Sequence, residues 1–145
     1  MEKINTILLV EDNPLDAELT LEALKEPAIA ENIVLLRDGV EALDYLFCRE
    51  KYADRLPKNP GLILLDLKMP KLNGLEVLRT IKGTEKLKSI PVIMLTSSKE
   101  TPDLKESYRL GVNAYVVKPV DYEQFANEVK TLGLFWGKVN KKPPE

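Results

Sequence analysis

The sequence contains no histidine and only one cysteine. Without histidine, the chain cannot form a His-based catalytic triad, an HExxH metal site or a phosphohistidine of its own. Any general base must therefore be a carboxylate, a lysine or a tyrosine. The single cysteine, Cys48, excludes an intramolecular disulfide and a zinc site built from cysteines alone.

Long hydrophobic runs are also lacking. No apolar segment approaches the roughly 18 residues that indicate a transmembrane helix. The N-terminal segment, MEKINTILLVED, becomes acidic too early and has too short an apolar run for a signal peptide. We therefore expect a cytoplasmic protein.

The overall composition is that of an ordinary globular domain. The chain has 145 residues, of which 44% are apolar and 30% are charged, and its net charge is -2. This length suits one domain with a single core. The balanced charge gives no indication of a general nucleic-acid or membrane surface.

Short apolar runs alternate with helical patterns along the chain. The runs are nearly continuous, as expected of strands that are covered on both faces. We predict strands at residues 6–11, 32–37, 62–66, 91–95 and 114–117. We predict helices at residues 13–26, 39–47, 74–82, 101–111 and 121 to 135 or 136. This order predicts an α/β fold: a five-stranded parallel sheet with helices on both sides and right-handed crossovers.

Local signals set several helix boundaries. Asn13 is the expected N-cap of the first helix, with Pro14 at its first position and Pro27 at its end. Thr101-Pro102-Asp103 is an N-cap signal for the fourth helix, and Asp121 is expected to cap the fifth. We find no internal repeat or domain break. We expect one domain over residues 1–136 and a flexible tail over residues 137–145, which are polar, basic and proline-rich.

The last predicted helix has one apolar stripe with two apolar residues off it. The stripe should pack on the sheet; it consists of Phe125, Val129, Leu132 and Trp136. Leu134 and Phe135 should point toward solvent or a neighbour, unless the chain bends after Gly133 and tucks them against its own domain. A glycine inside a helix costs roughly 1 kcal/mol relative to alanine, so this end should be weak in isolation.

Polar residues end four of the five predicted strands. They are Glu11-Asp12, Asp66, Thr96-Ser97-Ser98 and Lys118. Each alone could be a turn, a helix cap or a solvated surface group. Because ligands bind beyond the carboxyl ends of parallel strands, the combination instead indicates one site.

The residue types at this site favour phosphoryl chemistry. Three carboxylates that lie close together resist ionising together, and a divalent cation removes that conflict. All-oxygen ligands suit Mg²⁺. The metal and Lys118 would make a positive pocket around Asp66. In such a pocket a carboxylate can attack phosphorus and form an aspartyl phosphate, with catalysis mainly by positioning and charge stabilisation.

Four motifs together resemble the receiver domains of two-component response regulators: ILLVEDN, LILLDLKMPKLNG, VIMLTSS and AYVVKPVD. The resemblance covers roughly residues 4–136. It implies a flavodoxin-like fold with strand order 2-1-3-4-5. The long connection over residues 49–61 and the ending LFW resemble single-domain regulators partnered with bacterial phytochromes and related histidine kinases.

The resemblance implies a role for each strand-end residue. Asp66 is the expected phosphoacceptor, Asp12 a direct Mg²⁺ ligand and Glu11 a water-mediated one. Glu11 is longer than the aspartate often found at its position. The backbone carbonyl of Lys68 is the expected third protein ligand. Lys118 should bind the phosphate.

Further positions follow from the same resemblance. The Thr96 hydroxyl should turn toward the phosphate, and Tyr115 occupies the aromatic switch position. The Lys118–Pro119 peptide bond is expected to be cis. Gly74 should allow a helix to begin close to the sheet.

We therefore expect a stand-alone signalling switch rather than an enzyme, phosphorylated by a sensor histidine kinase. It would act through a downstream protein, or through a homodimer formed by the fourth helix, fifth strand and fifth helix. A phosphotransfer intermediate in a phosphorelay remains an alternative. A magnesium phosphatase of the haloacid dehalogenase type would need a second aspartate where Lys68 stands. A degenerate receiver that serves only as an interaction module is disfavoured by the intact acidic pair, Asp66, Thr96 and Lys118.

Overall fold

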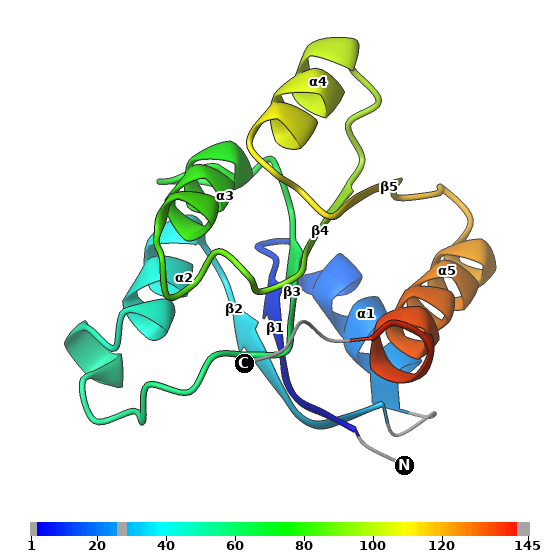
Figure 1. Cartoon of the computed structure of the whole chain (residues 1–145). Coiled ribbons are helices and arrows are strands. Elements are labelled where there is room, and N and C mark those ends of the chain that lie inside the picture. The colour runs from blue at the N-terminus through cyan, green and yellow to red at the C-terminus, as the bar shows by residue number, and fades with distance from the viewer. Residues whose placement is uncertain (1–2, 26–28, 142–145) are drawn as a thin grey trace.

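The computed structural model describes residues 3–25 and 29–141, and its centre is a five-stranded sheet (Figure 1). All neighbouring strands are parallel, in the order β2-β1-β3-β4-β5. The strands are β1 Ile4–Val10, β2 Ala30–Leu36, β3 Leu62–Leu65, β4 Val92–Thr96 and β5 Ala114–Val117. The predicted α/β class and strand order are confirmed, and each strand end lies within two residues of its predicted position.

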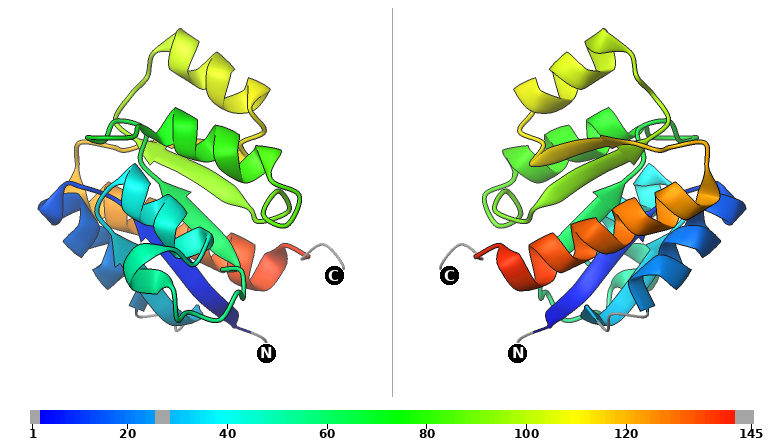
Figure 2. Two further views of the ribbon diagram at one scale, coloured as in Figure 1. Left: turned by 90° about the vertical axis from the view of Figure 1, so that its left-hand side faces the viewer. Right: turned by 90° about the vertical axis from the view of Figure 1, so that its right-hand side faces the viewer.

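Helices cover both faces of the sheet. They are α1 Pro14–Lys25, α2 Gly39–Leu46, α3 Gly74–Gly83, α4 Thr101–Arg109 and α5 Tyr122–Leu134. Two shorter turns are a 3-10 helix, η1 Glu50–Tyr52, and a π-helical turn, η2 Phe135–Val139. Figure 2 shows α5 running along the sheet beside α1, with α2 and α3 on the opposite face and α4 outermost. Within the described residues, no helix has both the length and the apolar character needed to cross a membrane.

Side chains of successive strand residues enter two separate cores. On β1, Leu8 and Val10 belong to the core shared with α2 and α3, whereas Ile7 and Leu9 belong to the core shared with α1 and α5. All four are at most 2% exposed. Full burial of one such side chain stabilises the fold by about 1.5–3 kcal/mol, so continuous apolar strands favour a sheet covered on both sides.

The predicted helix caps agree with the structure in two cases. Asn13 Oδ1 accepts a hydrogen bond from Asp16 N at 3.0 Å, and Asp121 Oδ2 accepts one from Gln124 N at 3.0 Å. For α4 the N-cap is Glu100, so Thr101 is already helical. The predicted end of the first helix at Pro27 lies outside the described residues.

The C-terminal helix packs along the predicted stripe. Phe125 and Val129 are buried in the core of α1 and α5, and Leu132 and Trp136 pack against it. Leu134 and Phe135 remain 39% and 44% exposed, so they lie off the packed stripe as predicted.

Gly133 is a close-packing position rather than only a weak point of the helix. A Cβ atom there would collide with the side chain of Ile29, and one at Gly137 would lie 2.8 Å from Ile29 Cγ2. The two glycines therefore let the end of the chain approach the first residues of the sheet. The π-helical turn η2 extends the ordered helix to Val139. The division of the chain into a domain over residues 1–136 and a tail over residues 137–145 stays a prediction.

Candidate functional site

The carboxyl ends of β1 and β3 bring three acidic side chains together. Glu11 and Asp12 follow β1, and Asp66 follows β3. Their carboxylate oxygens lie within 4.8 Å of one another. Glu11 is only 2% exposed and Asp66 only 8%, while Asp12 is the most open to solvent. Three hard oxygen donors at this spacing fit a Mg²⁺ ion.

Lys118, which follows β5, neutralises part of this charge. Its Nζ donates to Glu11 Oε1 at 2.6 Å, to Asp16 Oδ2 at 2.9 Å and to Asp66 Oδ2 at 3.4 Å. The lysine side chain is 7% exposed. An ammonium group has three protons, so each can serve one carboxylate.

Asp16 also belongs to this site, although it was not among the predicted site residues. It lies in the first turn of α1, directly after the acidic end of β1, and its side chain is 28% exposed. Its position only four residues after Asp12 was the sequence signal that could have assigned Asp16 to the site.

Burial and neighbouring charges change the proton affinities of this cluster. Burial, followed by the negative charge of Asp66, raises the pKa of Glu11 to about 7, although Lys118 partly opposes this. Burial alone would lower the pKa of Lys118, but its hydrogen bond to Glu11 and the charges of Asp66 and Glu11 outweigh burial and raise that pKa. Near neutral pH, a cation can therefore replace a proton at Glu11.

The β4–α4 loop connects Thr96 to Tyr115. Thr96 is fully buried, and its Oγ1 accepts a hydrogen bond from Ser98 N at 3.3 Å. The Tyr115 hydroxyl donates to Ser98 O at 3.0 Å. Burial raises the pKa of Tyr115, which keeps this hydroxyl protonated as a donor. Both predicted switch residues thus bond the same loop residue, Ser98.

Thr96 and Lys118 are also joined through the backbone, since Lys118 N donates to Thr96 O at 2.7 Å. The expected cis bond between Lys118 and Pro119 is wrong: every peptide bond among the described residues is trans. Trans is the intrinsically favoured isomer, by about 0.5–1 kcal/mol before proline. With that bond trans, the Lys118 ammonium still reaches Glu11, Asp16 and Asp66.

Gly74 has the predicted close approach to the sheet. Its N–H donates to Leu67 O at 2.8 Å, and a Cβ atom there would lie 2.8 Å from Leu67 Cα. Because only glycine fits, α3 begins directly against the loop that carries Asp66 and Lys68. That loop also contacts α4, since Lys68 Nζ lies 3.8 Å from Asp103 Oδ2.

Fold and site together define the family. The family model for the response regulator receiver domain matches residues 7–130, and the chain belongs to this family. Receiver domains are signalling switches that bind a divalent metal ion, and those associated with phytochromes work with sensor kinases.

Individual relatives are similar over nearly their whole length. The chain is 42% identical over 130 residues to the response regulator Rcp1 of Synechocystis, covering 90% of this chain and 87% of that protein. It is 41% identical over 137 residues to the probable methanogenesis regulatory protein FilR2 of Methanothrix harundinacea, covering 94% of this chain and 86% of that protein.

Solved structures give the same picture. The phosphorylated cyanobacterial phytochrome response regulator RcpA superimposes with a TM-score of 0.91 at 40% identity, covering 97% of this chain and 99% of the other. The Mn²⁺-bound form of Rcp1 has a TM-score of 0.90 at 38% identity, with the same two coverages.

Proposed function

We propose that this chain is a stand-alone response regulator whose Asp66 accepts a phosphoryl group from a sensor histidine kinase in the presence of Mg²⁺. One observation supports this above all: Asp66 lies buried at the end of β3 beside Glu11, Asp12 and the Lys118 ammonium. A buried carboxylate among other carboxylates is unfavourable unless a cation compensates it. The same cation and Lys118 suit a phosphoryl group.

In this proposal the residues divide the work of phosphoryl transfer. An oxygen of Asp66 attacks phosphorus, the bond from phosphorus to the kinase histidine breaks, and its electron pair returns to the imidazole. Glu11, Asp12, Asp66 and the carbonyl of Lys68 would hold Mg²⁺, which supplies positive charge at the phosphoryl oxygens when bound. Lys118 would move one of its three N–H bonds from Asp66 to a phosphoryl oxygen.

Thr96 and Tyr115 would carry the signal to the surface. When the Thr96 hydroxyl turns to a phosphoryl oxygen, it releases the N–H of Ser98. The position of Tyr115 depends on the same loop residue, because its hydroxyl bonds Ser98 O. A phosphoryl group that binds one of two loop arrangements better shifts the population toward that arrangement.

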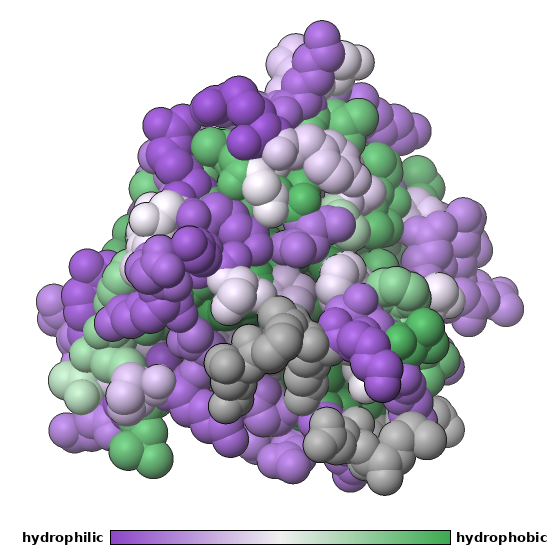
Figure 3. All heavy atoms as spheres, in the orientation of Figure 1, coloured by the Kyte–Doolittle hydropathy of each residue, from purple (hydrophilic) through white to green (hydrophobic). Residues whose placement is uncertain are grey.

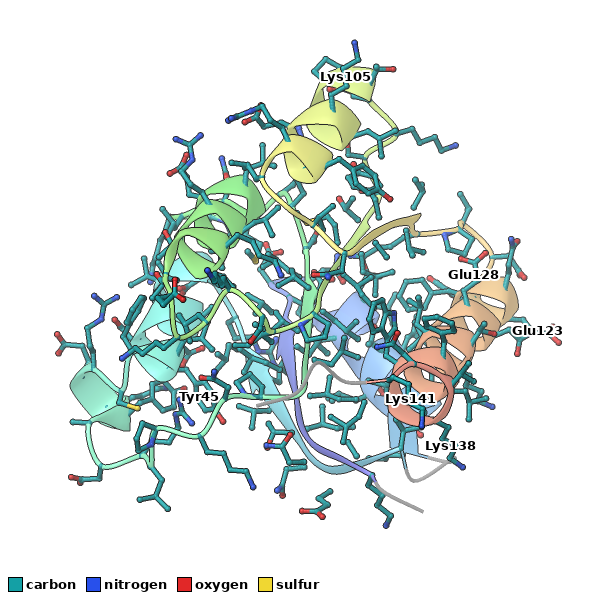
Figure 4. The ribbon with its side chains drawn as sticks, in the orientation of Figure 1. Tyr45, Lys105, Glu123, Glu128, Lys138 and Lys141 are labelled. Carbon is teal, nitrogen blue, oxygen red and sulfur yellow. The ribbon has the colours of Figure 1, made fainter. Side chains whose placement is uncertain are left out.

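We further propose a homodimer through the face formed by α4, β5 and α5. β5 is an edge strand and all four of its residues are only partly buried. Exposed apolar side chains lie on or just after the neighbouring helices: Leu104, Tyr108, Leu134 and Phe135. On α5 itself, Glu123 and Glu128 project outward (Figure 4), so acidic groups border this surface. The face seen in Figure 3 is largely hydrophilic, with hydrophobic atoms in areas between polar ones.

The proposed partner kinase is phytochrome-like, since relatives from phytochrome systems resemble the chain over almost its full length. Output would pass to a downstream protein in the cytoplasm, or onward by phosphotransfer. The chain's own chemistry would be limited to accepting the phosphoryl group and losing it slowly.

The test is transfer from candidate histidine kinases that carry radiolabelled phosphate from ATP. The wild type and an Asp54→Asn control, altered at an exposed aspartate, should be labelled by the cognate kinase. Asp66→Asn should not be labelled, and the chelator EDTA should prevent transfer to the wild type. Full labelling of Asp66→Asn would contradict the proposal.

A further inference from the structure

Helix α4 is held to the rest of the domain by few contacts. Ser107 is its only buried residue. The helix stands at the outer end of the molecule in Figure 1, and Lys105 points away from it into solvent (Figure 4). With little apolar burial, the polar contacts of its first turn have a large share in fixing its position.

Asp103 makes those contacts. Its Oδ2 accepts a hydrogen bond of 2.6 Å from Ser98 Oγ and lies 3.8 Å from Lys68 Nζ. The Asp103 side chain is 17% exposed, whereas Lys68 is 63% exposed. One carboxylate therefore joins α4 to the loop after β4 and to the loop after β3.

The Lys68 ammonium can pair with either of two anions, the Asp103 carboxylate or a phosphoryl group on Asp66. It follows Asp66 by two residues, so its flexible side chain starts from the same short loop as the proposed phosphoacceptor. An ion pair at 3.8 Å whose lysine is largely exposed is weak and easily exchanged. A phosphoryl group carries up to about two negative charges against one on Asp103.

We propose that Asp103 is a positioning residue of the phosphoryl site: it competes for the Lys68 ammonium and so sets how long a phosphoryl group survives on Asp66. This inference rests on the proposed function, because it requires an aspartyl phosphate. Whenever Lys68 lies on the phosphoryl group it obstructs water, and whenever it lies on Asp103 the path is open. When Lys68 leaves Asp103, the first turn of α4 loses one of its contacts. Phosphorylation of Asp66 would therefore affect the position of α4.

The step affected is hydrolysis. A water oxygen forms a bond to phosphorus, and the bond between phosphorus and the Asp66 oxygen breaks with its electron pair on the carboxylate. The water loses one proton to solvent and keeps the other in the hydrogen phosphate that leaves. Asp103 touches none of these atoms and acts only through Lys68.

The experiment measures the decay of labelled aspartyl phosphate in four proteins: wild type, Asp103→Asn, Lys68→Met and the double variant. Removing the competitor should leave Lys68 on the phosphoryl group for longer, so Asp103→Asn should decay about two- to fivefold more slowly. In the Lys68→Met background the same substitution should change nothing. Asp103→Glu, which keeps the charge, should restore a decay rate near that of wild type.

Glu106→Gln is the matched control, since Glu106 lies on the same helix but pairs with Arg109. It should decay at the wild-type rate. An Asp103→Asn effect of equal size with and without Lys68 would overturn the inference while leaving the proposed function intact, and so would an unchanged decay. A wild type that cannot be labelled at all would overturn both.

Discussion

The buried carboxylate of Glu11 should make the metal-free domain less stable as the pH rises. Glu11 is 2% exposed, and burial next to Asp66 raises its pKa from 4.5 to about 7. The folded state therefore binds a proton that the unfolded state has already lost between these values. The contribution of Glu11 to the free energy of unfolding is fully present below about pH 4.5 and is lost as the pH rises through about 7. At about 1.4 kcal/mol per pKa unit, the loss is roughly 3 kcal/mol.

Glu11→Gln tests this reasoning because glutamine imitates the protonated side chain. It can keep the hydrogen bond that Asn13 N donates to Glu11 Oε2 at 3.1 Å. In EDTA, the variant should be more stable than wild type at pH 7.5 by up to about 3 kcal/mol and similar to it at pH 5. With Mg²⁺ at pH 7.5, the stability difference between the variant and wild type should shrink or change sign, since the metal favours the ionised carboxylate of the wild type.

The assay is urea unfolding followed by circular dichroism at both pH values, with EDTA or with Mg²⁺. Glu18→Gln is the control, because Glu18 is an exposed carboxylate of α1. A Glu11→Gln protein that is less stable than wild type at pH 7.5 in EDTA would refute the reasoning. An equal gain in Glu18→Gln would refute it too.

Four further changes have expected outcomes. Lys68→Asn should speed loss of phosphate from Asp66 by removing a cation from the path of water; an unchanged or slower decay, measured by loss of label, contradicts this. Thr96→Ala should accept phosphate yet bind its partner no better when phosphorylated; a wild-type gain in affinity by titration contradicts the coupling. Phe135→Ser should weaken the proposed dimer in sedimentation with beryllofluoride, an acyl-phosphate mimic; a wild type that is monomeric at high concentration with and without it rules the dimer out. Gly133→Ala should destabilise by about 1–3 kcal/mol in urea unfolding, because the clash with Ile29 outweighs the roughly 1 kcal/mol gain in helix propensity; Gly83→Ala, with open space around it, is the control, and a stabilised Gly133→Ala contradicts the packing.

The sheet could be predicted because its signal is local in the sequence. Each strand is a continuous apolar run, and parallel strands align their carboxyl ends by topology alone. That rule alone predicts that Glu11, Asp12, Asp66 and Lys118 lie at one edge of the sheet, where the structure has them.

The missed features depend on details that periodicity does not contain. The bond between Lys118 and Asp16 joins residues 102 positions apart and requires the exact rotation of α1. The contact of Asp103 with Lys68 depends on how α4 is capped, and its N-cap is Glu100 rather than Thr101. Whether a glycine weakens a helix or permits close packing depends on the opposing surface, which the sequence does not identify.

Mapping the phosphorylated residue tests the central claim most directly. The protein would be incubated with Mg²⁺ and acetyl phosphate, reduced with borohydride to mark the acyl phosphate, digested and analysed by mass spectrometry. The account predicts that the mark lies on Asp66 and disappears when Mg²⁺ is chelated. A mark on another carboxylate, such as Asp12 or Asp16, or full modification without a metal ion, would contradict it.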